Sequence, residues 1–176
     1  MKSMLRLVLV LFLVCGIAAG ALSFVNAATK DRIAGFARLE REEALKQVFP
    51  GAEEFREVLP GRQWEALTGG TVAGHVFAAS IQGYSGPILS FFGLDSGSAV
   101  TGVRVLTHSE TPGLGAKITE EKFLKQFSGR SVGEVALRRD DPQGRIDAIT
   151  AATISSRAVT ASLRATIDGF LKGDLQ

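Results

Sequence analysis

Threonine and serine hydroxyls gather near the C-terminus of this 176-residue chain, where a helical pattern begins. Residues 147–153 read Asp-Ala-Ile-Thr-Ala-Ala-Thr, and Ile-Ser-Ser follows them. A helix N-terminus presents unpaired backbone N–H groups and a partial positive charge, which together favour a phosphate group. The same hydroxyls are also ordinary N-cap candidates. Spacing alone leaves both interpretations open, phosphate binding and simple capping.

The helix that would position these hydroxyls is predicted from the apolar residues that follow. Val159, Leu163, Ile167 and Phe170 recur at spacings of four, four and three, and Leu171 comes next. This pattern predicts a helix over residues 155–171 with one apolar face. Thr153 is therefore expected at or just before its N-terminus, and the small residues 151 and 152 would keep the approach open.

A second stretch with chemical potential is residues 108–117, His-Ser-Glu-Thr-Pro-Gly-Leu-Gly-Ala-Lys. Pro112-Gly113 suits the central positions of a type II turn, whose second residue needs a positive φ. Gly115 adds backbone freedom, so backbone N–H groups could come close to a ligand. Composition alone favours an ordinary irregular loop over a binding loop.

Residues 147–153 resemble the flavinylation motif of the FMN-binding domain family. That motif is Asp, two residues, Ser or Thr, Gly, Ala and Thr, and its last Thr carries FMN through a phosphoester bond. The corresponding residue here is Thr153, whereas Ala151 stands where the family usually has Gly. The added methyl group is tolerated at negative φ and strains the turn at positive φ.

Two further segments resemble the same family. Glu-Thr-Pro-Gly-Leu-Gly at residues 110–115 matches its second recurring motif, and residues 83–88 match one of its turns. The resemblance covers roughly residues 72–170, and the apolar N-terminal segment agrees with it. Within the family, the length and Thr150 resemble the G subunits of Rnf electron-transport complexes. The C subunits of sodium-pumping NADH:quinone reductases are similar but usually longer.

This resemblance implies a set of site residues. Thr153 would carry FMN covalently as a tether, with no catalytic residue and no metal ligand in the chain. Glu110 and Thr111 would hydrogen-bond the ring or ribityl groups, Leu114 would cover a ring face, and Lys117 would oppose the phosphate or a reduced flavin anion. The expected cofactor-binding residues are Glu110, Thr111, Leu114, Gly115, Lys117, Thr150, Ala151, Ala152 and Thr153.

The resemblance also implies partners and a function. Asp147, Thr150 and Thr153 would be recognised by a flavin transferase that uses Mg²⁺ and FAD as the donor. The chain would be an electron-transfer subunit of an ion-translocating ferredoxin:NAD⁺ oxidoreductase of the Rnf type, beside other membrane subunits, and not a complete enzyme alone. The alternatives are a non-redox assembly domain that keeps the fold, or an FMN carrier for another extracytoplasmic reductase.

The N-terminal part of the chain is apolar enough to enter a membrane. No charged residue lies between Arg6 and Lys30, a length that suits one helix across the lipid bilayer. We expect an uncleaved anchor over residues 1–29 with a short cytoplasmic end; the alternative is a signal peptide cleaved near Ala27. Basic residues flank both ends, so the resemblance alone implies a single-pass protein of the bacterial inner membrane with its domain on the periplasmic side.

The rest of the chain predicts an α+β fold, an antiparallel sheet with flanking helices. A connector helix is expected over residues 30–50 and an FMN-binding domain over residues 51–176. Strands are expected over 72–82, 88–94, 100–107 and 132–137, the first three as an antiparallel meander because their connections are short. A short helix capped by Thr119 is expected over 119–127. Residues 52–70 show no assignable pattern.

Composition excludes several other functions. Twenty Lys and Arg against eighteen Asp and Glu leave a nearly balanced charge, without the basic block that nucleic-acid binding requires. Cys15, the single cysteine, falls in the expected anchor and permits no intrachain disulfide. His75 and His108 are isolated, without a second ligand at metal spacing, so no metal site is expected.

Overall fold

A computed structural model describes residues 2–172 of the chain; Met1 and residues 173–176, which begin the expected anchor and end the expected domain, lie outside the described residues. Five antiparallel strands form one sheet in the order β1-β2-β3-β4-β5, so each strand pairs with its neighbour in sequence. The strands are β1 (Glu54–Leu59), β2 (Gln63–Thr68), β3 (Thr71–Gln82), β4 (Pro87–Asp95) and β5 (Val100–Thr107).

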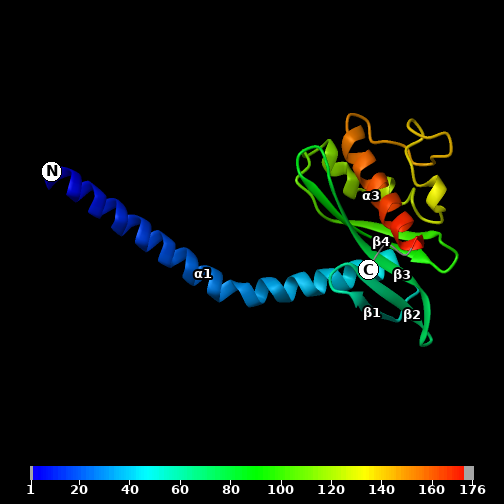
Figure 1. The fold of residues 1–176 in the computed structure, drawn as a ribbon, viewed down its shortest axis with the longest axis horizontal. Coiled ribbons are helices and arrows are strands. Elements are labelled where there is room, and N and C mark those ends of the chain that lie inside the picture. The colour runs from blue at the N-terminus through cyan, green and yellow to red at the C-terminus, as the bar shows by residue number, and fades with distance from the viewer. Residues whose placement is uncertain (1, 173–176) are drawn as a thin grey trace. The chain divides into compact units, whose positions relative to one another are not determined.

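Helix α3 (Thr153–Leu171) covers one face of this sheet (Figure 1). Its buried residues Val159, Leu163 and Ile167 pack with Phe77 of β3 and Phe92 of β4 in one apolar cluster. Three short helices complete this side of the domain: η1 (Gly115–Thr119), α2 (Glu121–Leu124) and η2 (Val132–Glu134). The main apolar core therefore lies between α3 and the sheet.

The opposite face of the sheet is covered by the end of helix α1 (Lys2–Val48). Val48 and Phe49 are buried there with Trp64 and Phe91, and Ala44 and Leu45 belong to the same cluster. Successive strand residues point to opposite faces, so Val76 faces this cluster while Phe77 faces α3. Both faces of the central strands are thus buried, which explains their long apolar runs.

Three glycines on neighbouring strands make room for this helix end. A Cβ on Gly74 would lie 2.6 Å from the Phe49 ring, one on Gly93 would lie 2.7 Å from the Val48 carbonyl oxygen, and one on Gly102 would lie 3.0 Å from it. We call Gly74, Gly93 and Gly102 the glycine seat. The Thr101 hydroxyl fastens the helix end further, because it donates to the Val48 carbonyl at 2.5 Å.

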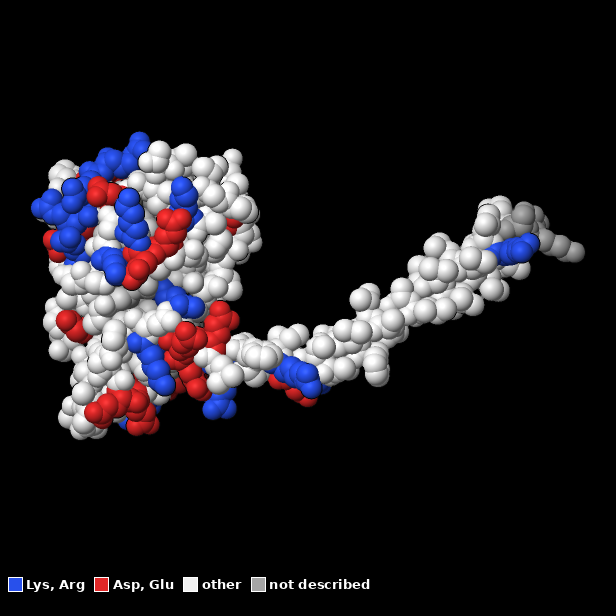
Figure 2. All heavy atoms as spheres, turned by 180° about the vertical axis from the view of Figure 1, so that it is seen from behind, with Lys and Arg blue, Asp and Glu red and all other residues white. Residues whose placement is uncertain are grey.

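The N-terminal part of α1 forms a unit of its own, residues Met1–Glu42, apart from the compact unit that begins at Glu43. By length and composition it is a helix that could cross a membrane. Figure 2 shows a long stretch of it without charged side chains. The helix continues without a break through the expected boundary at residue 29, and the division of the chain at residues 29 and 50 stays a prediction.

The α+β class and the antiparallel meander are confirmed, and the strands expected over 72–82, 88–94 and 100–107 are observed within a residue of their predicted ends. The unassigned residues 52–70 form β1 and β2. The strand predicted over 132–137 is wrong. Ser131 and Glu134 form a capping box that closes a 3₁₀ turn there, and only Leu137 pairs, with Ile146.

The helix predicted over 119–127 is also shorter than expected, since α2 spans only Glu121–Leu124. Thr119 does not cap it. Its hydroxyl donates instead to the Ala116 carbonyl at 2.9 Å, within the preceding 3₁₀ helix, and Glu120 takes the N-cap position. The hydroxyl is therefore used locally, as short polar side chains often are.

Candidate functional site

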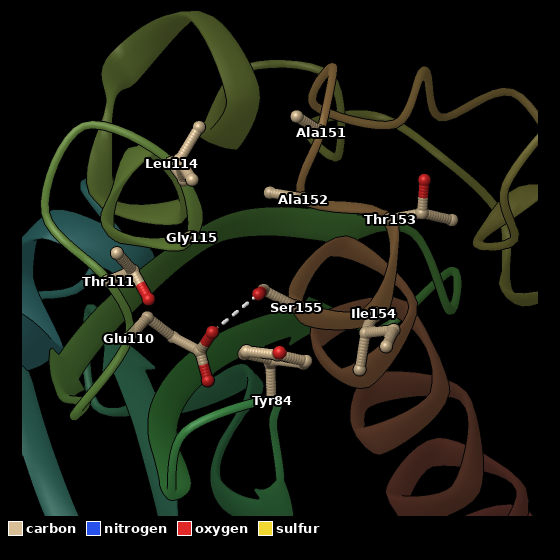
Figure 3. Close-up of a pocket in the computed structure, with 10 residues that line it drawn as sticks. All are labelled: Tyr84, Glu110, Thr111, Leu114, Gly115, Ala151, Ala152, Thr153, Ile154 and Ser155. Carbon is tan, nitrogen blue, oxygen red and sulfur yellow. Dashed lines mark hydrogen bonds between the residues drawn. The ribbon is translucent and has the colours of Figure 1, made fainter.

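A pocket of about 430 Å³ opens where the first turn of α3 meets the loop after β5 (Figure 3). This volume lies within the roughly 300–1,000 Å³ of small-molecule sites. Three separate parts of the chain line it, the turn after β3, the loop 110–115 and the start of α3. Its lining residues are Tyr84, Glu110, Thr111, Leu114, Gly115, Ala151, Ala152, Thr153, Ile154 and Ser155.

Thr153 is the first residue of α3, as the sequence pattern predicts. The N-cap residue is Ala152, and no side chain caps the helix with a hydrogen bond, so the N–H groups of the first turn have no side-chain partner at the cap. The Thr153 hydroxyl points away from Glu110 and Ser155 (Figure 3). It accepts a hydrogen bond from the Arg139 guanidinium, with 3.2 Å between Nη1 and Oγ1.

The turn that delivers Thr153 is held from inside the helix by Ser156. The Ser156 hydroxyl donates to the Ala152 carbonyl at 2.9 Å and accepts from the Ile149 backbone N–H at 3.0 Å. The Ala152 N–H in turn donates to the Ile149 carbonyl at 3.0 Å. The buried Ser156 hydroxyl thus forms hydrogen bonds with backbone groups at both ends of the turn. These two bonds explain a hydroxyl at residue 156 better than helix capping does.

Ala151 adopts a φ of 64°, in the left-handed region. This is the position where the FMN-binding family usually has glycine, and the condition for strain stated above is met. An alanine Cβ in this conformation costs roughly 1–2 kcal/mol relative to the ordinary regions. Gly113 has a φ of 76°, which agrees with the type II turn predicted for Pro112-Gly113.

Glu110 is buried and joins the three segments that line the pocket. One of its carboxylate oxygens accepts from the Ser155 hydroxyl at 2.6 Å, and the other accepts from the Ser85 backbone N–H at 3.1 Å. A Cβ on Gly115 would lie 2.5 Å from the first oxygen and 2.9 Å from Ser155 Oγ, so any larger residue would have to displace these two side chains. Glu110 therefore ties α3 to the turn after β3.

Apolar side chains surround the mouth of the pocket and are open to solvent. Tyr84 is 70% exposed, Ile154 51% and Leu114 45%. All three reach the pocket from different segments (Figure 3). Large apolar side chains left exposed around one cavity mark a binding site more often than chance packing does. The pocket thus combines apolar walls with a helix N-terminus and a hydroxyl.

A second pocket of about 380 Å³ contains the remaining predicted site residues. Lys117, Asp147 and Thr150 line it together with residues of α2. Gln126 brackets Asp147 on its backbone, accepting from its N–H at 2.8 Å and donating to its carbonyl at 3.4 Å. Thr150 and Thr153 therefore line different cavities, and Lys117 lies with Asp147 rather than with the pocket of Thr153.

Sequence reasoning named most of the first pocket and gave no binding role to three residues in or beside it, Arg139, Ile154 and Ser155. Ser155 carried only a capping interpretation and Ile154 carried none, whereas Tyr84 was interpreted as core or turn packing, with stacking on a flavin as the alternative. Arg139 was part of a polar turn, Arg138-Arg139-Asp140-Asp141, to which no role was given. The signal that remained unused was the position of this charged block before the threonine motif, with a basic residue available for an anion.

Two carboxylates of this block are bound by arginines of α3. The hydrogen bond from Arg157 holds the pKa of Asp140 below its usual range. For Asp141, the backbone N–H of Gln143 lowers the pKa first and Arg164 second. Both carboxylates therefore stay charged near neutral pH, and the turn stays paired with the helix.

Comparison with known proteins gives the family. Residues 83–168 match the FMN-binding domain, and residues 1–48 match the RnfG N-terminal region. The chain is 30% identical to the G subunit of the ion-translocating oxidoreductase complex of Methanosarcina acetivorans, over 95% of this chain and 94% of that one. It is also 30% identical to the G subunit of the Na⁺-translocating ferredoxin:NAD⁺ oxidoreductase complex of Acetobacterium woodii, over 94% and 91% of the two chains.

A solved structure agrees with the fold. The C subunit of the Na⁺-translocating NADH-quinone reductase of Parabacteroides distasonis superimposes with a TM-score of 0.54 at 25% identity, over 62% of this chain and 60% of that one. The match thus spans less than two thirds of the solved chain. From the two matched regions and the near full-length relatives, the chain belongs to the family of G subunits of ion-translocating oxidoreductase complexes and contains an FMN-binding domain.

Proposed function

We propose that this chain carries FMN covalently on Thr153 and passes electrons between partners in an ion-translocating ferredoxin:NAD⁺ oxidoreductase complex. One observation carries the proposal: the Thr153 hydroxyl lies at an uncapped helix N-terminus, at the edge of a pocket with exposed apolar walls. The match to the FMN-binding domain and the relatives among the G subunits support it.

The pocket residues fit an FMN group. Tyr84, Leu114 and Ile154 offer apolar surface for a planar ring, and the start of α3 offers N–H groups and partial positive charge for a phosphate. Bound there, FMN would supply the reversible uptake and release of electrons, while the protein positions and shields it. Both carboxylate oxygens of Glu110 already accept hydrogen bonds from the pocket walls. Glu110 would therefore hold these walls together rather than bind the flavin ring directly.

Attachment requires a transferase as a partner and FAD as the donor. In that reaction the Thr153 oxygen would form a bond to the FMN phosphorus of FAD, the pyrophosphate bond would break, AMP would leave and the hydroxyl proton would be released. Asp147 and Thr150 line a neighbouring cavity on the exposed side of the same turn, which suits recognition by that enzyme. Thr153 is afterwards a phosphoester and takes no part in proton transfer.

The experiment is to co-express the full-length chain with a flavin transferase in an exported form and to measure its denatured intact mass. A mass increase equal to FMN minus water, absent in Thr153→Ala and present in Thr150→Ala at reduced yield, is the expected result. A full-length, folded chain without added mass, beside a control substrate that is labelled, would remove the covalent proposal. Non-covalent FMN in the same pocket would then remain to be tested by fluorescence of the native protein.

The strain at Ala151 favours a second candidate, a non-redox assembly domain that keeps the fold. The mass measurement and the native fluorescence together separate the two candidates, because an assembly domain binds FMN neither covalently nor non-covalently. An FMN carrier for another extracytoplasmic reductase would be labelled, but it would fail to copurify with the other subunits of the complex from native membranes.

We propose further that α1 anchors the chain in the lipid bilayer with the domain on the periplasmic side. The test uses Ser96→Cys, on the exposed turn between β4 and β5, in a Cys15→Ser background. A membrane-impermeant maleimide added to intact cells should label this cysteine. Labelling only after the cells are broken would place the domain in the cytoplasm.

A further inference from the structure

Arg139 lies beside the hydroxyl that the proposed function assigns to the cofactor. Its guanidinium donates to Thr153 Oγ1 at 3.2 Å from a loop that joins the segment after η2 to the threonine motif. The Arg139 side chain is 63% exposed, so a contact to Thr153 is not forced by burial. Something else in the loop must hold the arginine at this place.

Two ion pairs fasten this loop to α3. Arg157 donates to both carboxylate oxygens of Asp140, at 2.6 and 2.8 Å, and Arg164 donates to Asp141 at 3.0 Å. Arg157 and Arg164 are about two turns apart on the same side of the helix. Thr153 lies one turn before Arg157. The residue next to Asp140 is therefore held over the first turn of α3.

The charge of Arg139 is left largely unbalanced by this arrangement. The carboxylate of Asp140 already binds Arg157 in a two-bond pair, and it lies 3.9 Å from Arg139. Within residues 2–172, this is the ion pair that the structure gives for Arg139, and its shorter contact is to a neutral hydroxyl. A guanidinium in this position has a donor fork suited to phosphate oxygens.

We propose that Arg139 is the anion-binding residue of the attachment site: it orients the Thr153 oxygen before transfer and pairs with the phosphodiester afterwards. This inference rests on the proposed function. The phosphodiester places one negative charge beside the atom that the arginine already contacts. The N-terminus of α3 places a partial positive charge beside the phosphodiester, whereas Arg139 places a full positive charge there.

The test follows the rate of flavin attachment to the full-length chain in detergent, with purified transferase, FAD and Mg²⁺, by denatured intact mass. Arg139→Gln keeps hydrogen-bonding ability and removes the charge, and we expect it to be labelled roughly tenfold more slowly or worse. Arg139→Lys should recover part of the rate. The matched control is Arg145→Gln, an exposed loop arginine that pairs only weakly with Glu134, and it should be labelled like the wild type.

A second readout separates anion binding from a structural role. Each chain is melted before and after labelling, and the native labelled proteins are compared by ³¹P NMR. Anion binding predicts that Arg139→Gln melts like the wild type before labelling, gains less on labelling, and shows a phosphorus resonance closer to that of the unfolded protein. A structural role predicts a lower melting temperature before labelling and an unchanged resonance.

The outcomes distinguish this inference from the proposed function. A wild type that is never labelled overturns both. A labelled wild type with Arg139→Gln labelled as fast, gaining as much stability and showing the same resonance, overturns only the role of Arg139. The role of Arg139 is established if Arg139→Gln is labelled slowly and gains less stability on labelling than the wild type, and if Arg139→Lys recovers part of the rate.

Discussion

The glycine seat and the turn before Thr153 restrict which residue the backbone can accept, and they do so for different reasons. In the glycine seat, a Cβ on Gly74, Gly93 or Gly102 would overlap with Val48 or Phe49 at the end of α1, and on Gly74 also with the Leu94 carbonyl oxygen. In the turn before Thr153, Ala151 retains a Cβ although its φ is 64°. The seat is limited by neighbouring atoms, whereas the turn is limited by the backbone conformation of the residue itself.

The difference shows where the chain can change. A clash with a neighbouring backbone carbonyl cannot be relieved by a side-chain rotation, so the seat has to remain glycine. The strain at the turn is local and of the order of 1–2 kcal/mol, which a folded domain can absorb. The turn that presents Thr153 is therefore a place where the chain stores strain next to its site.

The largest effect is expected in the seat. Gly93→Ala places a Cβ against the Val48 carbonyl, the Phe49 ring and the Thr101 hydroxyl, and we expect it to lower the free energy of unfolding by roughly 3 kcal/mol or more. The measurement is urea unfolding of the full-length chain in detergent, followed by the fluorescence of Trp64, which lies in the same cluster.

The matched control is Gly51→Ala, where the new Cβ would meet no atom within 4 Å. It should change the free energy of unfolding by no more than about 0.5 kcal/mol. Equal effects of the two substitutions would show that the seat is not sterically tight.

A smaller effect is expected at the one site glycine that is limited by neighbours. Gly115→Ala pushes against Glu110 and Ser155, and should lower the free energy of unfolding by about 1–3 kcal/mol and slow flavin attachment. In the seat, backbone carbonyl oxygens are among the neighbours, whereas the nearest atoms here all belong to side chains. Ser155→Ala in the same chain should therefore recover part of the loss. Strictly additive unfolding energies for the pair would contradict this contact.

Ala151→Gly tests the turn directly. Removing the Cβ relieves the strain of roughly 1–2 kcal/mol, and the greater freedom of glycine in the unfolded chain takes back about 0.5–1 kcal/mol. We expect a net gain in the free energy of unfolding of about 1 kcal/mol or less, together with faster attachment of flavin. Ala148→Gly, earlier in the same turn at an ordinary φ, should instead lose stability.

The smallest effect is expected at the other end of α3, where the His75 ring packs against Phe170 and Phe77. Burial lowers the pKa of His75 from its ordinary 6.5, and the Glu65 carboxylate opposes this shift. Below pH 6.5 the unfolded chain binds a proton that the folded chain binds less readily, so stability falls as the pH drops.

The check is the melting temperature between about pH 7.5 and 5.5, which should fall in the wild type and stay flatter in His75→Phe. The lowered pKa values of Glu134, Asp140 and Asp141 act in a lower window, because their stabilisation is lost only as the pH falls below about 4. If the melting temperature falls more steeply with pH in His75→Phe than in the wild type, folding does not lower the pKa of His75 and the prediction is wrong.

Sequence patterns predicted the elements whose burial follows one period. Strands β3, β4 and β5 and helix α3 have apolar residues that repeat on a packed face, and their ends were predicted closely. Strand β1 is an edge strand with mostly exposed residues, so it shows no such pattern. The conformation of residues 131–152 depends on individual hydrogen bonds from side chains to the backbone, such as the one between Ser156 and Ile149. These hydrogen bonds do not follow a hydrophobic period, so the sequence pattern could not predict them.

The site shows the same division. The resemblance assigned Thr153 and the loop 110–115 to one site, and in the structure both line the same pocket; their role in holding FMN stays a prediction. It did not separate Thr150 and Lys117 from that pocket, since Thr150 is only three residues from Thr153 and Lys117 only two from Gly115, yet both line the second cavity. Nothing in Arg138-Arg139-Asp140-Asp141 tells which arginine reaches Thr153 until the ion pairs with α3 are known.

The glycine seat also bears on how this domain can be cut free from its membrane helix. Leu45, Val48 and Phe49 belong to the core, although Pro50-Gly51 marks the end of the helix in the sequence. A recombinant fragment that starts at residue 51 would leave Trp64 and Phe91 open to water and would tend to aggregate. A fragment that starts shortly before Glu43 keeps the end of α1 on the seat, and a protease site engineered for release belongs on that side as well.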